Sequence, residues 1–257
     1  MLEYVIVIEI RALQTGPVTV QVLTLSSGRV NALDVEVLQE FTSAVREVQN
    51  SGAGALVVTG AGKVFSAGVD LDQVLQGGAD YTDRLIPALS DAFDALFCYP
   101  GPTVAAINGA AIAGGCVLAC ACDRRLISPD AKIGASEVRV GVPFPVAALE
   151  VVRYACGDRA EDLLLGGRLY RGDDAVASGL AHRVVADDLL EAAVAEASDL
   201  GGISAEAYAH TKGQLRAPAV ARIRAGGEID REVSRLWSAD HTRQRLADSM
   251  ESLRRRG

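Results

Sequence analysis

The sequence is poor in lysine and slightly acidic overall, which argues against a nucleic-acid partner. It has 257 residues, with 25 Lys and Arg against 33 Asp and Glu, giving a formal net charge of −8. Lys63, Lys132 and Lys212 are its only lysines. Because nucleic-acid-binding domains usually present a basic face, we expect no nucleic-acid partner. An anionic ligand would have to be held by arginines, backbone amides or those few lysines.

The sequence also lacks the uninterrupted apolar run of a membrane span. Its most apolar stretch, 95–122, is broken by prolines, glycines and Asn108, whereas a spanning helix needs about 20 consecutive apolar residues. The first ten residues, MLEYVIVIEI, contain two glutamates and no basic residue, unlike a secretory signal peptide. We therefore expect a cytoplasmic protein with no membrane partner.

Cysteine occurs without the companions that a disulfide framework or a metal site requires. The chain has five cysteines, three of them close together in the segment CVLACAC (116–122). An odd, clustered set does not fit a disulfide framework, and no His or carboxylate stands at ligand spacing from it. We expect buried thiols in a reducing compartment and no metal site.

What the sequence does contain is an alternation of β-rich and helical segments, which predicts an α/β core over residues 1–186. The remainder, 187–257, has a helical pattern. A short helix is expected to start near Asp70, a mobile loop is expected at 76–83, and another helix opens within 108–123. The other predicted strands are 4–10, 18–25, 55–60, 103–108, 124–128, 132–136 and 182–185, and the other predicted helices are 34–50, 83–97, 146–156, 158–166 and 173–178.

Two short motifs place a small residue and a glycine directly before a helix: FSAGVDL (65–71) and AIAGGC (111–116). Such turns expose backbone N–H groups at the positive end of a helix. Two of these donors aimed at one point would form an oxyanion hole. The same residues would also suit tight turns that only pack a strand on a helix, so both interpretations remain open at this level.

Five separated segments resemble the crotonase (enoyl-CoA hydratase/isomerase) superfamily in order and spacing. They are VNALD (30–34), FSAGVDL, AAINGAAIAGGCVLACACDRRL (105–126), KIGASEVRVGVPFP (132–145) and GLAHRVV (179–185). The resemblance implies an α/β fold with a core of ββα repeats arranged in a spiral over 1–186, followed by a helical trimerisation region over 187–257. It also implies an acyl-CoA thioester as ligand and a homotrimer or a hexamer built from two trimers.

The resemblance further implies a set of catalytic groups. The backbone amides of Ala67 and Gly114 would hold the thioester oxygen, and Glu137 would carry the proton. Hydratases of the family use a second glutamate, and Val117 occupies that position. The resemblance therefore points to a Δ3,Δ2-enoyl-CoA isomerase and away from an efficient hydratase.

The same resemblance predicts the surroundings of these groups. Val117, Val140 and Phe144 would form the acyl pocket and raise the pKa of Glu137 by excluding water. The coenzyme A moiety would contact the five residues Arg29, Ala32, Val69, Asp70 and Leu71.

Three further points complete the prediction. Lys212 is a second candidate for a phosphate contact, while Asp70 and Asp123 suit the beginning and the end of helices. No metal or redox cofactor is called for, because the coenzyme A thioester is the substrate. The alternatives are a non-catalytic acyl-CoA-binding protein, another enolate chemistry such as decarboxylation, C–C hydrolysis or dienoyl isomerisation, and a plain α/β interaction protein.

Overall fold

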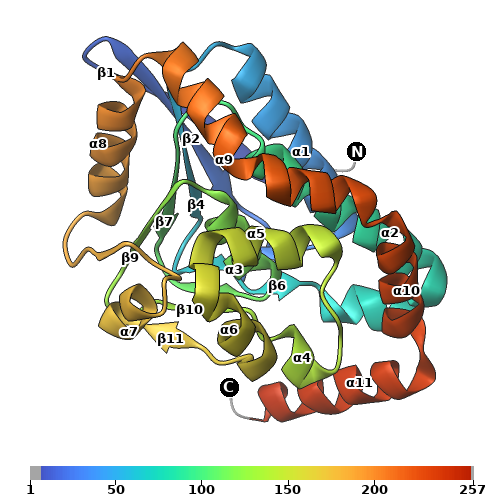
Figure 1. Cartoon of the computed structure of the whole chain (residues 1–257). Helices are drawn as coiled ribbons and strands as arrows, with labels where there is room; N and C mark the ends of the chain where they lie inside the picture. The colour runs from blue at the N-terminus through green and yellow to red at the C-terminus, as the bar shows by residue number, and fades with distance from the viewer. Residues whose placement is uncertain (1–6, 256–257) are drawn as a thin grey trace, which may run out of the picture.

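The computed structural model describes residues 7–255, and its main strands lie between helices on both sides (Figure 1). The strands are β1 (Ile8–Thr15), β2 (Val18–Leu25), β3 (Ala32–Leu33), β4 (Ala55–Gly60), β5 (Val64–Ser66), β6 (Gly68–Val69), β7 (Thr103–Ile107), β8 (Ala110–Ile112), β9 (Arg124–Ile127), β10 (Lys132–Gly134), β11 (Tyr170–Arg171) and β12 (Arg183–Val184). The helices are α1 (Val35–Asn50), α2 (Leu71–Phe97), α3 (Gly114–Ala121), α4 (Glu137–Val140), α5 (Val146–Cys156), α6 (Ala160–Gly166), α7 (Gly172–Ala177), α8 (Leu189–Gly201), α9 (Ala205–Ala225), α10 (Gly227–Ser238) and α11 (Asp240–Arg254).

Successive ββα units build the core. One strand of each unit enters a six-stranded sheet of order β1-β2-β4-β7-β9-β12, and the next enters a four-stranded sheet of order β11-β10-β8-β5. The units β4-β5-α2, β7-β8-α3 and β9-β10-α4 thus advance through both sheets together, in parallel pairing. This arrangement brings the ends of β6, β8 and β10 to one place, where α2, α3 and α4 begin.

Helices cover both faces of the large sheet, and its central strands β4 and β7 are accordingly buried along their whole length. Val20, Val57 and Val104 are buried on the face that α8 covers, together with Ala193 and Ala197 of that helix. Leu23, Leu56 and Ile107 belong to the larger core on the opposite face, with α1, α2 and α3. The alternation along β2 therefore divides its side chains between two apolar layers.

Most of the predicted elements are present, and one prediction is wrong. The segment 76–83 is not a loop: α2 continues through it, with one non-helical residue, Gly78 (φ 58°), where the helix bends. Tyr81 and Thr82 are buried, and their burial holds this part of the helix against the core. The predicted strand 4–10 lies partly outside the described residues, and β1 runs on from Ile8 to Thr15.

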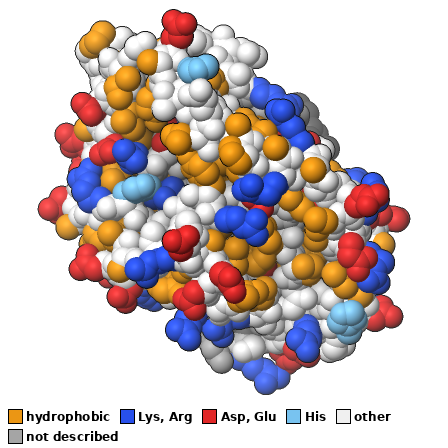
Figure 2. All heavy atoms as spheres, in the orientation of Figure 1, with side chains coloured by type: hydrophobic (Ala, Val, Ile, Leu, Met, Phe, Trp, Pro, Cys, Tyr) orange, Lys and Arg blue, Asp and Glu red, His pale blue; other side chains and the backbone are white. Residues whose placement is uncertain are grey.

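The surface and the cysteines bear on two further expectations. On the face shown in Figure 2, lysine and arginine side chains are interspersed with acidic and apolar ones and form no continuous basic surface. Among residues 7–255, no helix is long and apolar enough to cross a bilayer. Four of the five cysteines are buried and unbridged as predicted, whereas Cys98 is exposed.

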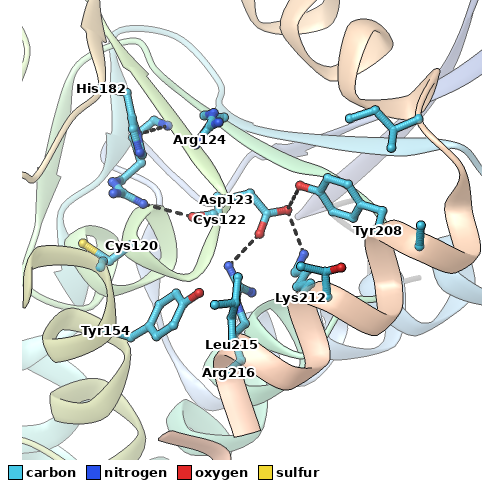
Figure 3. A pocket seen from close by; sticks show the side chains of 15 residues that line it. Cys120, Cys122, Asp123, Arg124, Tyr154, His182, Tyr208, Lys212, Leu215 and Arg216 are labelled. Atoms are coloured by element: carbon cyan, nitrogen blue, oxygen red, sulfur yellow. Dashed lines mark hydrogen bonds and ion pairs between the residues drawn. The ribbon is translucent and has the colours of Figure 1, made fainter. Parts of the chain in front are cut away.

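A buried ionic cluster attaches α9 to the core (Figure 3). Asp123, just after α3, accepts hydrogen bonds from Lys212 Nζ at 2.8 Å, Arg216 Nη2 at 2.6 Å and Tyr208 Oη at 3.0 Å. Burial alone would raise the pKa of Asp123, but Lys212 and Arg216 outweigh it and hold the pKa below its usual value. Asp123 therefore does more than close a helix, and Lys212 is committed to it.

We expect Asp123→Asn to destabilise the fold by about 3–5 kcal/mol, because it leaves Lys212 and Arg216 as buried cations without a counter-ion. Since the lowered pKa of Asp123 stabilises the protein only above that pKa, the wild-type advantage should disappear as the pH falls through it. Chemical denaturation of both proteins between pH 7 and pH 2 measures the difference. An advantage that persists unchanged at low pH would contradict this role of the carboxylate.

Candidate active site

Asn31 ties together the loops on which the site is built. Its amide donates to the carbonyl oxygens of Ala61 and Val64 at 3.1 and 2.7 Å, and its side-chain oxygen accepts from Ser27 N. Ser66 Oγ in turn donates to Asn31 O at 2.7 Å and accepts from Gly68 N at 3.1 Å. The VNALD and FSAGVDL motifs thus form one hydrogen-bonded unit, which fixes the position of β6.

The second turn lies directly against β6. Gly68 has φ +86°, and a Cβ built there would lie 2.7 Å from Ile112 O and 3.2 Å from Gly114 N. A side chain at this position would have to displace the backbone of the neighbouring turn. Glycine is therefore required both by its conformation and by the close approach of the start of α3.

The N-terminus of α3 is left without a side-chain cap. Ala113 precedes the helix with φ 53° and makes no side-chain cap bond. Its own N–H donates to Gly134 O, and its carbonyl accepts from Val117 N. The backbone amides of the first turn, starting with Gly114 N, have no acceptor within the helix. They lie at its positive end.

The prediction that Ala67 supplies an oxyanion donor is wrong. Ala67 N donates to Val30 O at 3.0 Å, so its hydrogen is already in use. The pairing of β3 with β6 instead leaves the backbone N–H of Val69 available as a donor. Leu33 lies opposite Val69 in the parallel pair β3–β6 and accepts from Asp70 N at 3.0 Å. Because Leu33 bonds to the two neighbours of its partner, the N–H of Val69 points away from β3.

Glu137 is the first residue of α4, a one-turn helix that ends at Gly141 in the left-handed conformation. Its side chain is buried, and its Oε2 atom has no hydrogen-bond partner. Burial raises the pKa of this carboxyl to about 8, although a hydrogen bond from its own backbone amide acts in the opposite direction. The result is a carboxyl group that is held in an apolar setting and ready to exchange a proton near neutral pH.

Glu137 shares a cavity of about 120 Å³ with both glycine turns. Ala67, Val69 and Gly114 of the two turns line this cavity. The structure therefore brings Glu137 and the turns together as predicted. The remaining lining residues come mainly from α2, α5, α10 and the segments around α4: Leu71, Leu89, Phe93, Ile112, Ala113, Ser136, Val140, Val142, Pro145, Ala148 and Trp237.

The predicted acyl pocket is correct at one of its three residues. Val140 lines the cavity. Phe144 does not: it lies in a separate groove with Val138 and Leu149, because the chain after α4 turns Val142 and Pro145 toward the cavity instead. Val117 is fully buried within α3 and is not among the lining residues.

The residues predicted to bind coenzyme A fall into two places. Arg29 is exposed in the turn before β3, close in sequence to Ala32, whose strand pairs with β6. Asp70 caps α2 by accepting from Gln73 N at 3.1 Å. Val69 and Leu71, which were also predicted to contact coenzyme A, line the cavity with Glu137. Lys212 lies in the Asp123 cluster, so its predicted phosphate contact is replaced by an ion pair.

Sequence reasoning missed Leu89, Phe93 and Trp237, which complete the cavity. Leu89 and Phe93 follow helical spacing on α2, a signal that predicts a buried face without saying what it faces. Trp237 gave no local signal. Among the described residues, no group of His, Cys, Asp or Glu side chains has the arrangement of a metal site.

Comparison with known proteins agrees with this geometry. The sequence model of the family described as Enoyl-CoA hydratase/isomerase matches residues 15–253. A "Probable enoyl-CoA hydratase echA8" of Mycobacterium bovis is 37% identical over 192 residues, which is 73% of this chain and 74% of the relative. A "Putative enoyl-CoA hydratase" of Thermus thermophilus is 39% identical over 160 residues, 61% of this chain and 63% of the relative, so that match spans less than two thirds of either protein.

Solved structures are similar over most of the chain. The human mitochondrial delta3-delta2-enoyl-CoA isomerase superposes with a TM-score of 0.89 at 25% identity, covering 96% of this chain and 98% of the human one. An apo structure described as an Mtb enoyl-CoA isomerase gives a TM-score of 0.78 at 29% identity, covering 87% and 97%.

The fold and the cavity define an α/β enzyme of the crotonase superfamily with its site between two glycine turns and a buried glutamate. The chain belongs to the enoyl-CoA hydratase/isomerase family.

The close approach of the two turns can be tested with a pair of glycine substitutions. Gly62 has φ +68° and open space around its missing Cβ, whereas a Cβ on Gly68 would meet backbone. We expect Gly62→Ala to cost about 1–2 kcal/mol from its conformation alone. Gly68→Ala should cost about 1–3 kcal/mol more because of overpacking. Equal losses in chemical denaturation would show that the turns can separate freely.

The pKa of Glu137 predicts how stability depends on pH. Above about pH 4.5 the unfolded glutamate has lost its proton, while the folded one keeps it up to about pH 8. The wild-type protein should therefore lose about 1.4 kcal/mol per pH unit relative to Glu137→Gln across this window, and no difference should develop below it. A difference in unfolding free energy between the two proteins that stays constant from pH 4.5 to pH 8 would refute the raised pKa.

Proposed function

We propose that this chain is a Δ3,Δ2-enoyl-CoA isomerase in which Glu137 carries a proton from C2 to C4 of the acyl group. The observation that carries the proposal is the buried carboxyl of Glu137, with an unpartnered oxygen, in one cavity with the uncapped start of α3. Among the described residues that line this cavity, it is the one carboxylic acid.

The chemistry uses one base and two amides. The Glu137 carboxylate removes a proton from C2 of a 3-enoyl thioester, and the electron pair moves into the thioester, forming a dienolate. We assign the charge on the oxygen to the N–H groups of Val69 and Gly114, where a helix end and a dry site strengthen hydrogen bonds to an anion. The dienolate then takes the proton back from Glu137 at C4, leaving the double bond between C2 and C3. The reaction is redox-neutral, so the proposal requires no cofactor.

The pKa of Glu137 suits this role. A base that titrates near 8 is strong enough to attack a weakly acidic C–H, and a fraction of it is still ionised at neutral pH. After it has taken the proton, its acid form is stable in the apolar cavity and returns the proton without exchange into water.

Several relatives are named as hydratases, but the residues of this chain favour isomerisation. Adding water across a double bond requires a group that positions the water and another that manages its proton. The position of the second family glutamate is Val117, which is apolar and fully buried. The likeness of the whole chain to the human isomerase supports the same choice.

The proposal extends to the rest of the ligand and to assembly. We assign the coenzyme A moiety to the exposed Arg29 and the backbone around Ala32, at the open side of β3 and β6. We also infer that the chain forms a homotrimer or a hexamer, which light scattering coupled to size-exclusion chromatography would measure.

Glu137→Gln should lower kcat for the conversion of 3-hexenoyl-CoA to 2-hexenoyl-CoA by about 10²–10⁴-fold, because the amide cannot accept the C2 proton. Formation of the conjugated thioester is followed by its ultraviolet absorbance. Unchanged turnover would remove Glu137 from the mechanism.

Glu150→Gln is the matched control. Glu150 is also a buried glutamate, but it lies on α5 and pairs with Arg153 and Arg222 outside the cavity. This variant should keep kcat at a temperature where it remains folded. The same assay with 2-enoyl-CoA and 3-oxoacyl-CoA tests the alternatives: efficient hydration, decarboxylation or C–C cleavage would replace the isomerase proposal, and binding without turnover of any thioester would indicate a carrier.

A further inference from the structure

Trp237 is the only tryptophan of the sequence, and it lines the cavity that contains Glu137. It comes from α10, which packs against α2 at the edge of the core (Figure 1). The indole is almost completely buried, with 3% of its surface exposed. A large aromatic side chain from the C-terminal helices therefore closes part of a cavity whose reactive groups come from the ββα units.

Hydrogen bonds hold this aromatic wall in place. Trp237 Nε1 donates to Pro143 O at 2.9 Å, which fixes the plane of the indole. Seven residues earlier on the same helix, Asp230 accepts from Val146 N at 2.8 Å and so caps the start of α5. Gly226, just before α10, lies so close to Val146 that a Cβ there would be 2.7 Å from its side chain. The indole is thus a rigid boundary of the cavity.

The cavity that this wall closes is small. Its volume of about 120 Å³ lies well below the roughly 300–1,000 Å³ of pockets that enclose drug-sized ligands. The apolar side chains that share this space with Trp237 include Leu89, Phe93, Val142 and Ala148, and the indole is the bulkiest of them.

We propose that Trp237 sets the upper limit of acyl length and restricts the enzyme to short-chain 3-enoyl-CoA substrates. The proposal rests on the proposed isomerase function for its substrate class. A longer chain would have to displace an indole that is hydrogen-bonded at one edge and almost completely buried. Removing the ring would open the cavity toward α10 while leaving Glu137, Val69 and Gly114 in place.

The first experiment measures kcat/KM with 3-enoyl-CoA substrates of 4, 6, 8, 10 and 12 carbons. We expect wild-type kcat/KM to fall at least about tenfold between six and ten carbons, since a longer chain must displace the buried, hydrogen-bonded indole and overpack the cavity. Trp237→Ala should shift the optimum to eight or ten carbons, and Trp237→Phe should give an intermediate profile. A length profile that is flat in the wild type, or that is identical in the Trp237 variants, would overturn the proposal.

Val233→Ala is the matched control. Val233 is buried on the same helix but does not line the cavity, so this variant loosens the packing of α10 without enlarging the cavity. It should keep the wild-type length profile. If it also accepts long chains, helix mobility and not the volume of the indole sets the limit. Should Trp237→Ala fail to fold in a thermal melt, Trp237→Phe and Trp237→Leu carry the comparison.

A second measurement separates this inference from the isomerase proposal. Because Trp237 is the sole tryptophan, its fluorescence reports directly on the cavity of the wild-type protein. Titration with butanoyl-CoA should change the indole emission and saturate at a lower concentration than titration with decanoyl-CoA. If no 3-enoyl-CoA of any length is isomerised but butanoyl-CoA still binds more tightly, the isomerase proposal fails and the length limit stands. Equal or tighter binding of decanoyl-CoA would refute the length limit whatever the reaction.

Discussion

The contact between two backbone turns is the constraint on which the rest of the site depends. Gly68 and the start of α3 approach so closely that a side chain on Gly68 would strike Ile112 O, and one on Gly115 would lie 2.5 Å from Ser66 O. Hydrogen bonds from Asn31 and Ser66 hold one turn, and the bond from Ala113 N to Gly134 O holds the other. The amides of Val69 and Gly114, to which we assign the thioester oxygen, are thus held in place by these contacts.

This contact also explains the arrangement of Glu137. Gly134, which accepts from Ala113 N, ends β10, and Glu137 follows three residues later at the start of α4. The bond that orients the start of α3 therefore also sets the point from which the carboxyl group projects. Because the surrounding side chains are apolar, the same geometry dehydrates the carboxyl and raises its pKa. The uncapped start of α3 and the Glu137 carboxyl consequently line one cavity, and Glu137 Oε2 accepts no hydrogen bond there.

The sequence was sufficient for the parts of the site that depend on local chemistry. The two glycine turns and the Asp70 cap follow from short motifs, because their conformations are specified within a few residues. Glu137 was indicated only by the family resemblance. The sequence alone could not show that the N–H of Val69, and not that of Ala67, is available to a ligand. The direction of each N–H depends on the pairing of β3 with β6, two strands of two residues each. Phe144 was misplaced for a similar reason: only the path of the chain after Gly141 decides which side chains face inward.

The helical structure of the C-terminal region was predicted, but the way in which each of its helices is attached to the core was not. Helix α9 is attached to the core by the ion pairs of Lys212 and Arg216 with Asp123. Asp123 lies about 90 residues before both of them in the sequence, and no sequence pattern indicates that they pair. Helix α10 is attached by Asp230 and Trp237 to the start of α5 and to Pro143.

These attachments make α10 part of the site, because Trp237 lines the cavity. Without α10 the cavity would lose its tryptophan wall and open to water. The raised pKa of Glu137 arises from burial, so a wetter cavity would return that carboxyl toward an ordinary acid, which is too weak a base for the chemistry. In the mechanism that we propose, the glycine turns supply the donors, and α10 keeps Glu137 buried enough to act as the base.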